Sequence, residues 1–456
     1  MKRRDFLKSG SAATTAAIGS YTGSFILLNN PGSVLATPVN DQVNLALVGC
    51  GSRSGMLRDA IVKRADVRFL YAIDVQASRA ANAAKITSKP DTATQAIQDI
   101  KIALDDKNVD GVVLVTPDHW HALHTIMACQ AGKDVFVEKP LSRTPFEGEQ
   151  MVNAARKYNR VLQVGTQSRS AQYCKNAKQY IDEGNLGKIE FCRVHNMWPT
   201  QGPSTIETAP IPADLLWDVW LGPAAYRDFS PLYMRGLQWE WFWGLGVGIL
   251  GVQGVHQFDV ARWILGLKYP KSVYAVGKLD CPPGGRETPD TLSAIFDFGS
   301  LVLNVEQTIG KPYMLETDWQ VREGDLFPYW YQNATRIEIY GSKALMVIGR
   351  LGAGWQVFIR TKDRKPVTVA EEYGRYTSDD HIYNYVDCIR TRKPTNCPIE
   401  EGFYSTMLVH YMNMSYRAGE VKLLVNPDDG HITNCPATNA FWRPEYRKEY
   451  DIPEIK

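Results

Sequence analysis

The chain has 456 residues, more than the roughly 250–300 at which one hydrophobic core stops growing, so two domains are expected. Its 51 basic and 49 acidic residues give a formal net charge of +2 and are mixed along the chain. That balance excludes the clustered basic face of a nucleic-acid-binding protein. The 12 tryptophans, 22 tyrosines and 15 phenylalanines suit either a carbohydrate-facing pocket or a large core.

The N-terminus has the pattern of a twin-arginine (Tat-type) export signal. Arg3 and Arg4 precede a mildly apolar, Ala- and Ser-rich stretch, and Val34-Leu35-Ala36 has the small residues of a cleavage site. The alternative is a basic N-terminal tail. We expect residues 1–36 to be a signal peptide and the protein to be periplasmic or otherwise exported through the Tat pathway. No later run of about 18 or more apolar residues occurs, so no membrane span is expected in the mature chain.

Eight cysteines lie far apart, without the Cys-x-x-Cys spacing of a structural zinc site, and no metal site is expected. An oxidising compartment permits a disulfide. Cys388 with Cys397 and Cys281 with Cys435 are both candidates, and the spacing does not choose between them.

Residues 43–48 form an apolar strand that runs directly into a glycine turn and then into a helical pattern. The turn reads Gly-x-Gly-x-x-x-Gly from Gly49 to Gly55. Strand, glycine turn and helix are the context of a dinucleotide-binding fingerprint, in which the backbone approaches a pyrophosphate at the helix N-terminus. Gly49, Gly51, Ser52 and Arg53 are therefore candidates for binding a cofactor.

A second strand, residues 67–73, ends in Asp74. An acidic residue about 20 positions after the glycines accepts the hydroxyls of an adenine ribose and repels a 2′-phosphate. NAD is therefore expected in preference to NADP, although Arg79 nearby keeps NADP open.

Two further strands end in polar segments. Residues 111–115 lead into Thr116-Pro117-Asp118-His119-Trp120-His121, and residues 135–137 lead into Glu138-Lys139-Pro140. A helix over 121–131 separates them. This alternation predicts a parallel, doubly wound α/β sheet that binds ligands beyond the carboxyl ends of its strands.

Lys139 is the most informative residue of the chain. It is either a solvated lysine in a turn or a proton acceptor whose pKa is lowered by burial or by a nearby cation. The strands and glycine turn that precede it favour the proton acceptor.

After about residue 165 the pattern changes to alternating strands, which predict a mainly antiparallel sheet with one covered face. Expected strands cover 189–197, 271–280, 291–298, 301–309, 335–340, 344–349 and 355–361. Expected helices cover 170–184, 255–265, 380–392 and 401–418. An insert over 199–243, rich in Trp, Tyr and Pro, is expected to form substrate or subunit surface.

These motifs, in this order, resemble those of the Gfo/Idh/MocA oxidoreductases. The segments 164–170, 217–223 and 443–446 are similar to those of exported, sugar-acting members. The resemblance implies an NAD-binding Rossmann domain over 37–165. It also implies a C-terminal domain over 166–456 with a large open sheet, through which members often form homo-oligomers. By this resemblance Thr116, Pro117, His121, Glu138, Lys139 and Gln167 are candidates for cofactor binding.

His256 is the second catalytic candidate. A lone helical histidine is often structural, but the resemblance places one here beside the motif lysine and the substrate hydroxyl. Asp259 could orient it or bind a neighbouring backbone. The chain departs from the family at Val252, where an Asp or Asn is usual. Either Lys139 and His256 suffice, or another polar residue substitutes, or turnover is weak.

Three functions follow. The first is an NAD(P)-dependent oxidoreductase with tightly bound cofactor, acting on a secondary hydroxyl of a sugar, glycoside or cyclic polyol. The second is a glycoside-cleaving enzyme that uses NAD for transient oxidation, elimination and re-reduction. The third, motivated by Val252, is a catalytically weak protein that binds sugars or dinucleotides.

Overall fold

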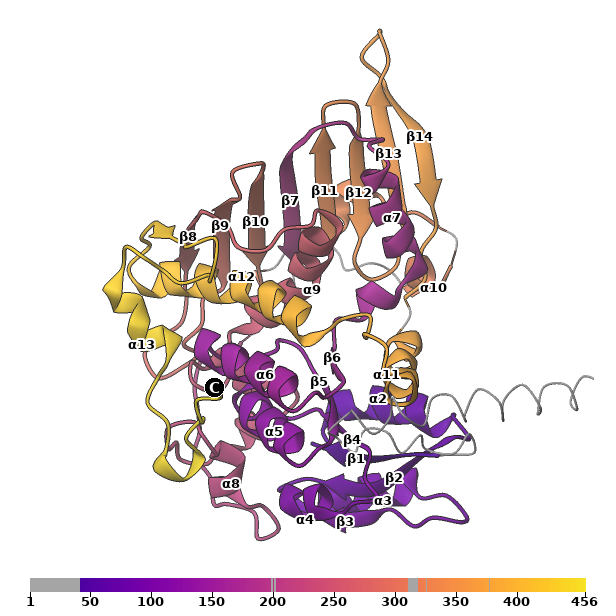
Figure 1. Cartoon of the computed structure of the whole chain (residues 1–456). Helices are drawn as coiled ribbons and strands as arrows, with labels where there is room; N and C mark the ends of the chain where they lie inside the picture. The colour runs from indigo at the N-terminus through magenta and orange to yellow at the C-terminus, as the bar shows by residue number, and fades with distance from the viewer. Residues whose placement is uncertain (1–41, 198–199, 201, 311–318, 325, 377) are drawn as a thin grey trace, which may run out of the picture. The chain divides into compact units, whose positions relative to one another are not determined.

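The computed structural model describes residues 42–197, 200, 202–310, 319–324, 326–376 and 378–456. Residues 43–456 form one compact unit with a six-stranded and a nine-stranded sheet (Figure 1). The expected signal peptide, residues 1–36, lies outside the described residues, so the export signal stays a prediction.

The six-stranded sheet is entirely parallel, with strand order β3-β2-β1-β4-β5-β6. Its strands are β1 (Val43–Val48), β2 (Val67–Ile73), β3 (Gln95–Ile97), β4 (Gly111–Leu114), β5 (Asp134–Val137) and β6 (Leu162–Val164). The helices that alternate with them are α2 (Ser52–Val62), α3 (Ala77–Thr87), α4 (Ile100–Asp105), α5 (Asp118–Gln130) and α6 (Pro145–Lys157). The order reverses between β1 and β4, the place where doubly wound sheets bind ligands. The predicted α/β class is confirmed.

Both faces of this sheet are buried, as in other parallel sheets. Alternate residues of β1 point to opposite faces: Leu45 and Leu47 pack with α2, and Ala46 and Val48 face the core that includes α5. A helix from late in the chain, α11 (Asp379–Thr391), completes the first face with Tyr385 fully buried. The sequence had grouped this helix with the second domain.

The nine-stranded sheet is mixed but mainly antiparallel, with order β14-β13-β12-β11-β7-β10-β9-β8-β15. Its strands are β7 (Ile189–Met197), β8 (Ser272–Lys278), β9 (Thr291–Asp297), β10 (Val302–Thr308), β11 (Arg336–Gly341), β12 (Leu345–Gly349), β13 (Trp355–Arg360), β14 (Pro366–Glu372) and β15 (Leu423–Leu424). Within this sheet, only β7 and β10 pair in parallel among the described strands. The chain between them is long enough for the crossover that a parallel pair requires.

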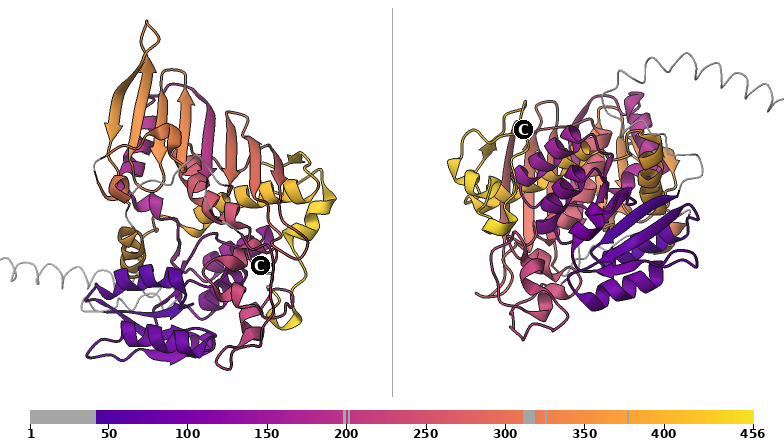
Figure 2. Two further views of the ribbon diagram at one scale, coloured as in Figure 1. Left: turned by 180° about the vertical axis from the view of Figure 1, so that it is seen from behind. Right: turned by 60° about the horizontal axis from the view of Figure 1, so that its bottom comes forward.

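Helices cover one face of the nine-stranded sheet: α7 (Gln172–Asp182), α9 (Ile249–Ile264) and α12 (Ile399–Arg417) (Figure 1). The opposite face, turned to the viewer in the left panel of Figure 2, is exposed over β8 and β9. Tyr274, Val276 and Ile295 are 41%, 45% and 51% exposed. The predicted one-sided covering of this sheet is therefore present.

The remaining elements are short. They are η1 (Gln167–Ser170), α8 (Trp217–Leu221), η2 (Pro231–Met234), η3 (Gln238–Trp241), α10 (Trp319–Glu323), η4 (Trp330–Gln332), η5 (Pro436–Thr438), α13 (Asn439–Trp442) and η6 (Lys448–Tyr450). All eight cysteines are free thiols, so neither candidate disulfide forms. Among the described helices, none combines the length and apolar character that crossing a membrane requires.

Candidate active site

The turn between β1 and α2 depends on two glycines. Gly49 has φ +87°, and a Cβ atom there would lie 2.6 Å from the carbonyl oxygen of Val115. A side chain is therefore excluded by both backbone conformation and space. Gly51 leaves open space where a side chain would stand. Because the first N–H groups of a helix have no intrahelical acceptor, Ser52 and Arg53 at the start of α2 offer an anion-binding backbone.

A cavity of about 540 Å³ lies beyond the carboxyl ends of the parallel strands. Nine of the predicted cofactor residues line it: Gly49, Gly51, Ser52, Arg53, Asp74, Thr116, Pro117, Glu138 and Lys139. The hydroxyl oxygen of Thr116 is buried and has no hydrogen-bond partner among the described residues. Ligand sites commonly measure about 300–1,000 Å³. The size of the cavity, the anion-binding turn and this unpaired hydroxyl fit a dinucleotide.

Two predicted cofactor residues lie behind the cavity wall. His121 places Nδ1 2.9 Å from the Pro140 carbonyl and Nε2 3.0 Å from the Thr116 carbonyl. It therefore ties together the two segments that follow β4 and β5. Gln167 donates to the Gly165 carbonyl at 3.1 Å and accepts from the Arg53 guanidinium. Both residues position lining residues rather than forming the lining.

Asp74 lies at the end of β2 in the cavity wall. Its two carboxylate oxygens accept the N–H groups of Cys50 at 2.8 Å and Gln76 at 2.9 Å. Each oxygen keeps a lone pair for a further donor. Arg79, which could have bound a 2′-phosphate, donates instead to the Met234 carbonyl at 2.9 Å. This arrangement favours NAD over NADP.

Replacing Asp74 by serine is expected to weaken NAD binding about tenfold, or ~1.4 kcal/mol, and to strengthen NADP binding. The carboxylate is lost as a ribose acceptor and as a repulsive charge. Titrating nucleotide-stripped protein with each cofactor measures both effects. Asp91→Ser removes an exposed carboxylate outside the cavity and is the control. Unchanged NADP affinity in Asp74→Ser would contradict this role.

Lys139 follows β5 and lies in the cavity wall, preceding a cis peptide bond to Pro140. Its Nζ donates to the Val252 carbonyl at 3.4 Å. Burial lowers the pKa of Lys139, and the nearby carboxylates only partly oppose this effect. The neutral amine that accepts a proton is thus populated at lower pH than in an ordinary lysine.

Glu138 holds the neighbouring charges in place. One carboxylate oxygen accepts a hydrogen bond from Nε of Arg53 at 2.8 Å, and the other accepts one from the backbone N–H of Lys139 at 3.2 Å. Burial would raise the pKa of Glu138, but Arg53 and Lys139 outweigh it and lower that pKa. Glu138 is therefore an ionised carboxylate that fixes both the turn helix and the lysine.

Two carboxyl groups beside Lys139 were missed by the sequence interpretation. Asp118 begins α5, and Glu240 lies in η3 within the aromatic insert; both line the cavity. Asp118 belongs to the polar segment that follows β4, and a polar residue at such a strand end indicates a ligand site. Glu240 carries no comparable signal, because its approach to Lys139 depends on how the insert folds back.

His256 lies on α9, one helical turn after Val252. Its side chain is buried, and burial, followed by Arg350, Lys139 and Arg53, lowers its pKa well below the usual value. The imidazole is therefore neutral and close to the lysine, although it lies outside the cavity lining. The charge of Lys139 thus acts on His256, but His256 is not a lining residue of the cavity, and its catalytic role stays a prediction.

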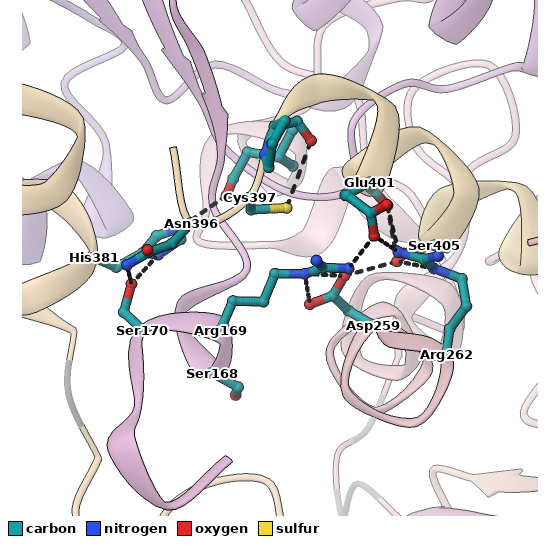
Figure 3. A network of polar contacts seen from close by, with 12 residues as sticks. Ser168, Arg169, Ser170, Asp259, Arg262, His381, Asn396, Cys397, Glu401 and Ser405 are labelled. Atoms are coloured by element: carbon teal, nitrogen blue, oxygen red, sulfur yellow. Dashed lines mark hydrogen bonds and ion pairs between the residues drawn. The ribbon is translucent and has the colours of Figure 1, made fainter. Parts of the chain in front are cut away.

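The expectation that Asp259 orients His256 or binds backbone is wrong. The Asp259 carboxylate accepts Nε of Arg169 at 2.9 Å and the hydroxyl of Ser405 at 2.7 Å (Figure 3). Arg169 also donates to Glu401 at 2.9 Å, and Arg262 pairs with Glu401 from the other side. This buried ionic network joins η1, α9 and α12.

The aromatic insert forms the outer wall of the cavity. Trp220, Tyr233 and Leu237 are among its lining residues. Asp214 anchors the insert: its carboxylate accepts the hydroxyl of Ser78 at 2.6 Å, and its carbonyl accepts the N–H of Ala77 at 3.0 Å. The insert is thus attached to the start of α3 and supplies part of the cavity wall.

Comparison with known proteins agrees with this geometry. Two domain models of one family match: the Gfo/Idh/MocA oxidoreductase family, NAD-binding Rossmann fold, over residues 43–166, and the Gfo/Idh/MocA C-terminal domain over 218–347. The chain belongs to the Gfo/Idh/MocA oxidoreductases, and its first sheet forms an NAD-binding Rossmann domain.

Several of the named relatives are sugar or polyol dehydrogenases. Levoglucosan dehydrogenase of Pseudarthrobacter phenanthrenivorans is 38% identical over 169 residues, 37% of this chain and 36% of that enzyme. Myo-inositol 2-dehydrogenase of Thermotoga maritima is 25% identical over 66% of this chain and 73% of its own length. A solved levoglucosan dehydrogenase, in complex with NADH and levoglucosan, has a TM-score of 0.61 at 20% identity, over 84% of this chain and 99% of that chain.

Proposed function

We propose that the protein is an NAD-dependent dehydrogenase that oxidises a secondary hydroxyl of a sugar, glycoside or cyclic polyol and retains its cofactor between turnovers. The observation that carries this proposal is Lys139, a lysine with a lowered pKa at the end of β5 in a cavity built for a dinucleotide. The family membership and the named relatives support the class of substrate.

Each residue around the reacting carbon has a defined task. When bound, NAD supplies the acceptor for the hydride that leaves the carbinol carbon. Lys139 takes the hydroxyl proton, and His256 stays neutral beside it. Glu138 and Arg53 fix the lysine against the turn helix. General base catalysis of this kind contributes about 10²- to 10⁴-fold.

The aromatic insert supports retention of the cofactor. Its anchors at Asp214 and Arg79 attach it to the first sheet beside Asp74, where the adenosine half of NAD would lie. A retained cofactor also suits a protein exported in folded form, as the twin arginine predicts, because the compartment outside the cytoplasm would offer no pool of free NAD.

The test is to denature the purified protein, identify any released nucleotide and its redox state, and then offer sugars, glycosides and polyols to the native protein. We expect NAD or NADH to be released and the nicotinamide absorbance to change with a neutral sugar or polyol. Cleavage of a glycoside without net NADH would favour the transient-oxidation reaction. Bound nucleotide that no compound reduces or oxidises would favour the binding protein.

The open face of the nine-stranded sheet supports a homo-oligomer. Tyr274, Val276 and Ile295 place exposed apolar side chains on adjacent strands, β8 and β9. Apolar surface of this kind marks an interface.

Light scattering is expected to give the mass of a dimer or tetramer, and the variant Ile295→Lys is expected to shift that mass toward the monomer. Lys157→Glu, at an exposed position near the end of α6, is the control; a wild-type monomer would contradict this proposal.

A further inference from the structure

We propose that Glu240 is a further proton-transfer residue of this site: with Lys139 it forms a buried pair that passes on the substrate proton, in place of the polar side chain that Val252 lacks. This inference rests on the proposed function and extends it. It assigns a chemical task to a residue of the aromatic insert, 101 positions after the lysine in sequence.

The first observation is geometric. Asp118 and Glu240 both lie close to Gly246: a Cβ atom there would stand 3.3 Å from Oδ2 of Asp118 and 3.1 Å from Cα of Glu240. Both residues line the cavity whose wall also contains Lys139. The short loop before α9 thus packs against both residues at this cavity.

The second observation is that each carboxyl group has one buried oxygen without a partner. Oδ2 of Asp118 and Oε2 of Glu240 are buried, and neither has a hydrogen-bond partner among the described residues. Asp118 and Glu240 are 2% exposed. Because a buried carboxyl group without a partner is destabilising, such groups mark places where a ligand or a proton completes the site.

The third observation is the electrostatic coupling of the pair. Burial raises the pKa of Glu240 to about 8, and Lys139 opposes that rise. Burial lowers the pKa of Lys139, and Glu240 opposes that fall more than any other group. The two shifts bring the pKa values of the two groups closer together, which lowers the free-energy cost of moving a proton from one group to the other.

Other charged groups also face the pair. They are Asp118 on α5, Glu138 and Arg53 at the lysine, Glu147 on α6 behind Asp118, and the neutral His256 on α9. Among these, the carboxylates of Asp118 and Glu138 also raise the pKa of Lys139, and Arg53 lowers it. Glu240 is distinguished by its effect on the pKa of Lys139, which is larger than that of the other carboxylates, and by its position on the insert.

The substrate O–H bond breaks and its proton passes to the Lys139 amine; NAD, when bound, would take the C–H bonding pair as hydride. Because Nζ of Lys139 has no ion pair with Glu240 among the described residues, the ammonium gives that proton to the Glu240 carboxylate through a water molecule in the cavity, which restores the amine. The carbinol has lost one proton and one hydride, and the pair has gained the proton. The active form of the pair is therefore the one without a shared proton.

The variant Glu240→Gln tests this assignment, with Asp228→Asn, an exposed carboxylate of the same insert, as the control. The first measurement needs no substrate: the pH dependence of acylation of Lys139 by acetic anhydride, followed by mass spectrometry. Without the Glu240 charge, the apparent pKa of Lys139 is expected to fall by about 1 to 3 units. Asp228→Asn is expected to leave it unchanged.

The second measurement is the pH dependence of single-turnover hydride transfer. Because Lys139 loses its proton at lower pH in Glu240→Gln, the half-maximal pH is expected to fall, and the plateau rate to drop about tenfold or more. Glu240→Asp keeps the carboxyl group and should give intermediate values; it also serves if the glutamine variant does not fold.

The outcomes separate the two proposals. A shifted Lys139 titration without oxidation of any sugar or polyol supports the pair and overturns the proposed function. An unshifted Lys139 titration overturns the pair, whatever the enzyme oxidises. A shifted titration with an unchanged pH–rate profile overturns the proton-transfer role of Glu240.

Discussion

Replacing Lys139 by alanine is expected to slow hydride transfer about 10²- to 10⁴-fold while the protein keeps its bound nucleotide. Lys139 is the group positioned to take the substrate proton, whereas the cofactor is held mainly by the glycine turn and Asp74. Single-turnover absorbance of the nicotinamide measures the rate, and nucleotide released on denaturation measures retention. Lys157→Ala, which removes an exposed lysine of α6, should match the wild type.

The arginine variant separates base catalysis from simple positive charge. Arg is not deprotonated in proteins, so Lys139→Arg keeps the cation and loses the base. It is expected to be nearly as slow as the alanine variant. In the wild type the rate should rise with pH through the pKa of Lys139, which burial lowers from 10.5, and stay high above it. A rapid arginine variant would show that the amine is not the base.

Replacing Asp259 by alanine is expected to lower the free energy of unfolding by about 3 to 5 kcal/mol. Asp259 is fully buried and pairs with the 2%-exposed guanidinium of Arg169 at 2.9 Å. Its loss leaves Arg169 and Arg262 to share Glu401, which adds an uncompensated buried charge. Urea denaturation followed by tryptophan fluorescence measures the change.

The matched control for this variant is Asp182→Ala. Asp182 forms an exposed i,i+4 pair with Lys178 at 2.8 Å on α7, and such pairs contribute only about 0.3–0.5 kcal/mol. Equal loss of stability in the two variants would contradict the importance of the buried network. Asp259→Ala should also slow hydride transfer, because α9 carries both Val252 and His256.

The first sheet could be predicted closely because its signals are local. Each parallel strand is an apolar run that ends in a polar or glycine-rich segment, and the parallel topology brings these ends to one edge. The sequence alone therefore predicts that one site contains Gly49, Asp74 and Lys139, and all three line the cavity. His121 and Gln167 could not be placed as precisely, because whether a side chain lines a cavity or supports its wall depends on rotamers.

The start of α9 shows where local signals mislead. The helix was predicted from 255 but begins at Ile249. Its first half is rich in glycine, which disfavours helix. Those glycines permit close packing: a Cβ atom at Gly251 would lie 2.6 Å from Val409, and one at Gly254 2.4 Å from Gln307. Tertiary contact, absent from the sequence pattern, outweighs helix propensity here.

The outer wall of the cavity and the proposed proton carrier belong to the same segment of chain. If the insert around Glu240 moved away to let nucleotide out, it would also withdraw the carboxyl group that completes the reacting centre. The protein could then not turn over while the cleft is open. The hydride held by the reduced nicotinamide would be shielded from solvent and could pass only to a molecule bound in the same cavity. Selection for a tighter wall and selection for faster proton transfer would act on the same segment, the aromatic insert.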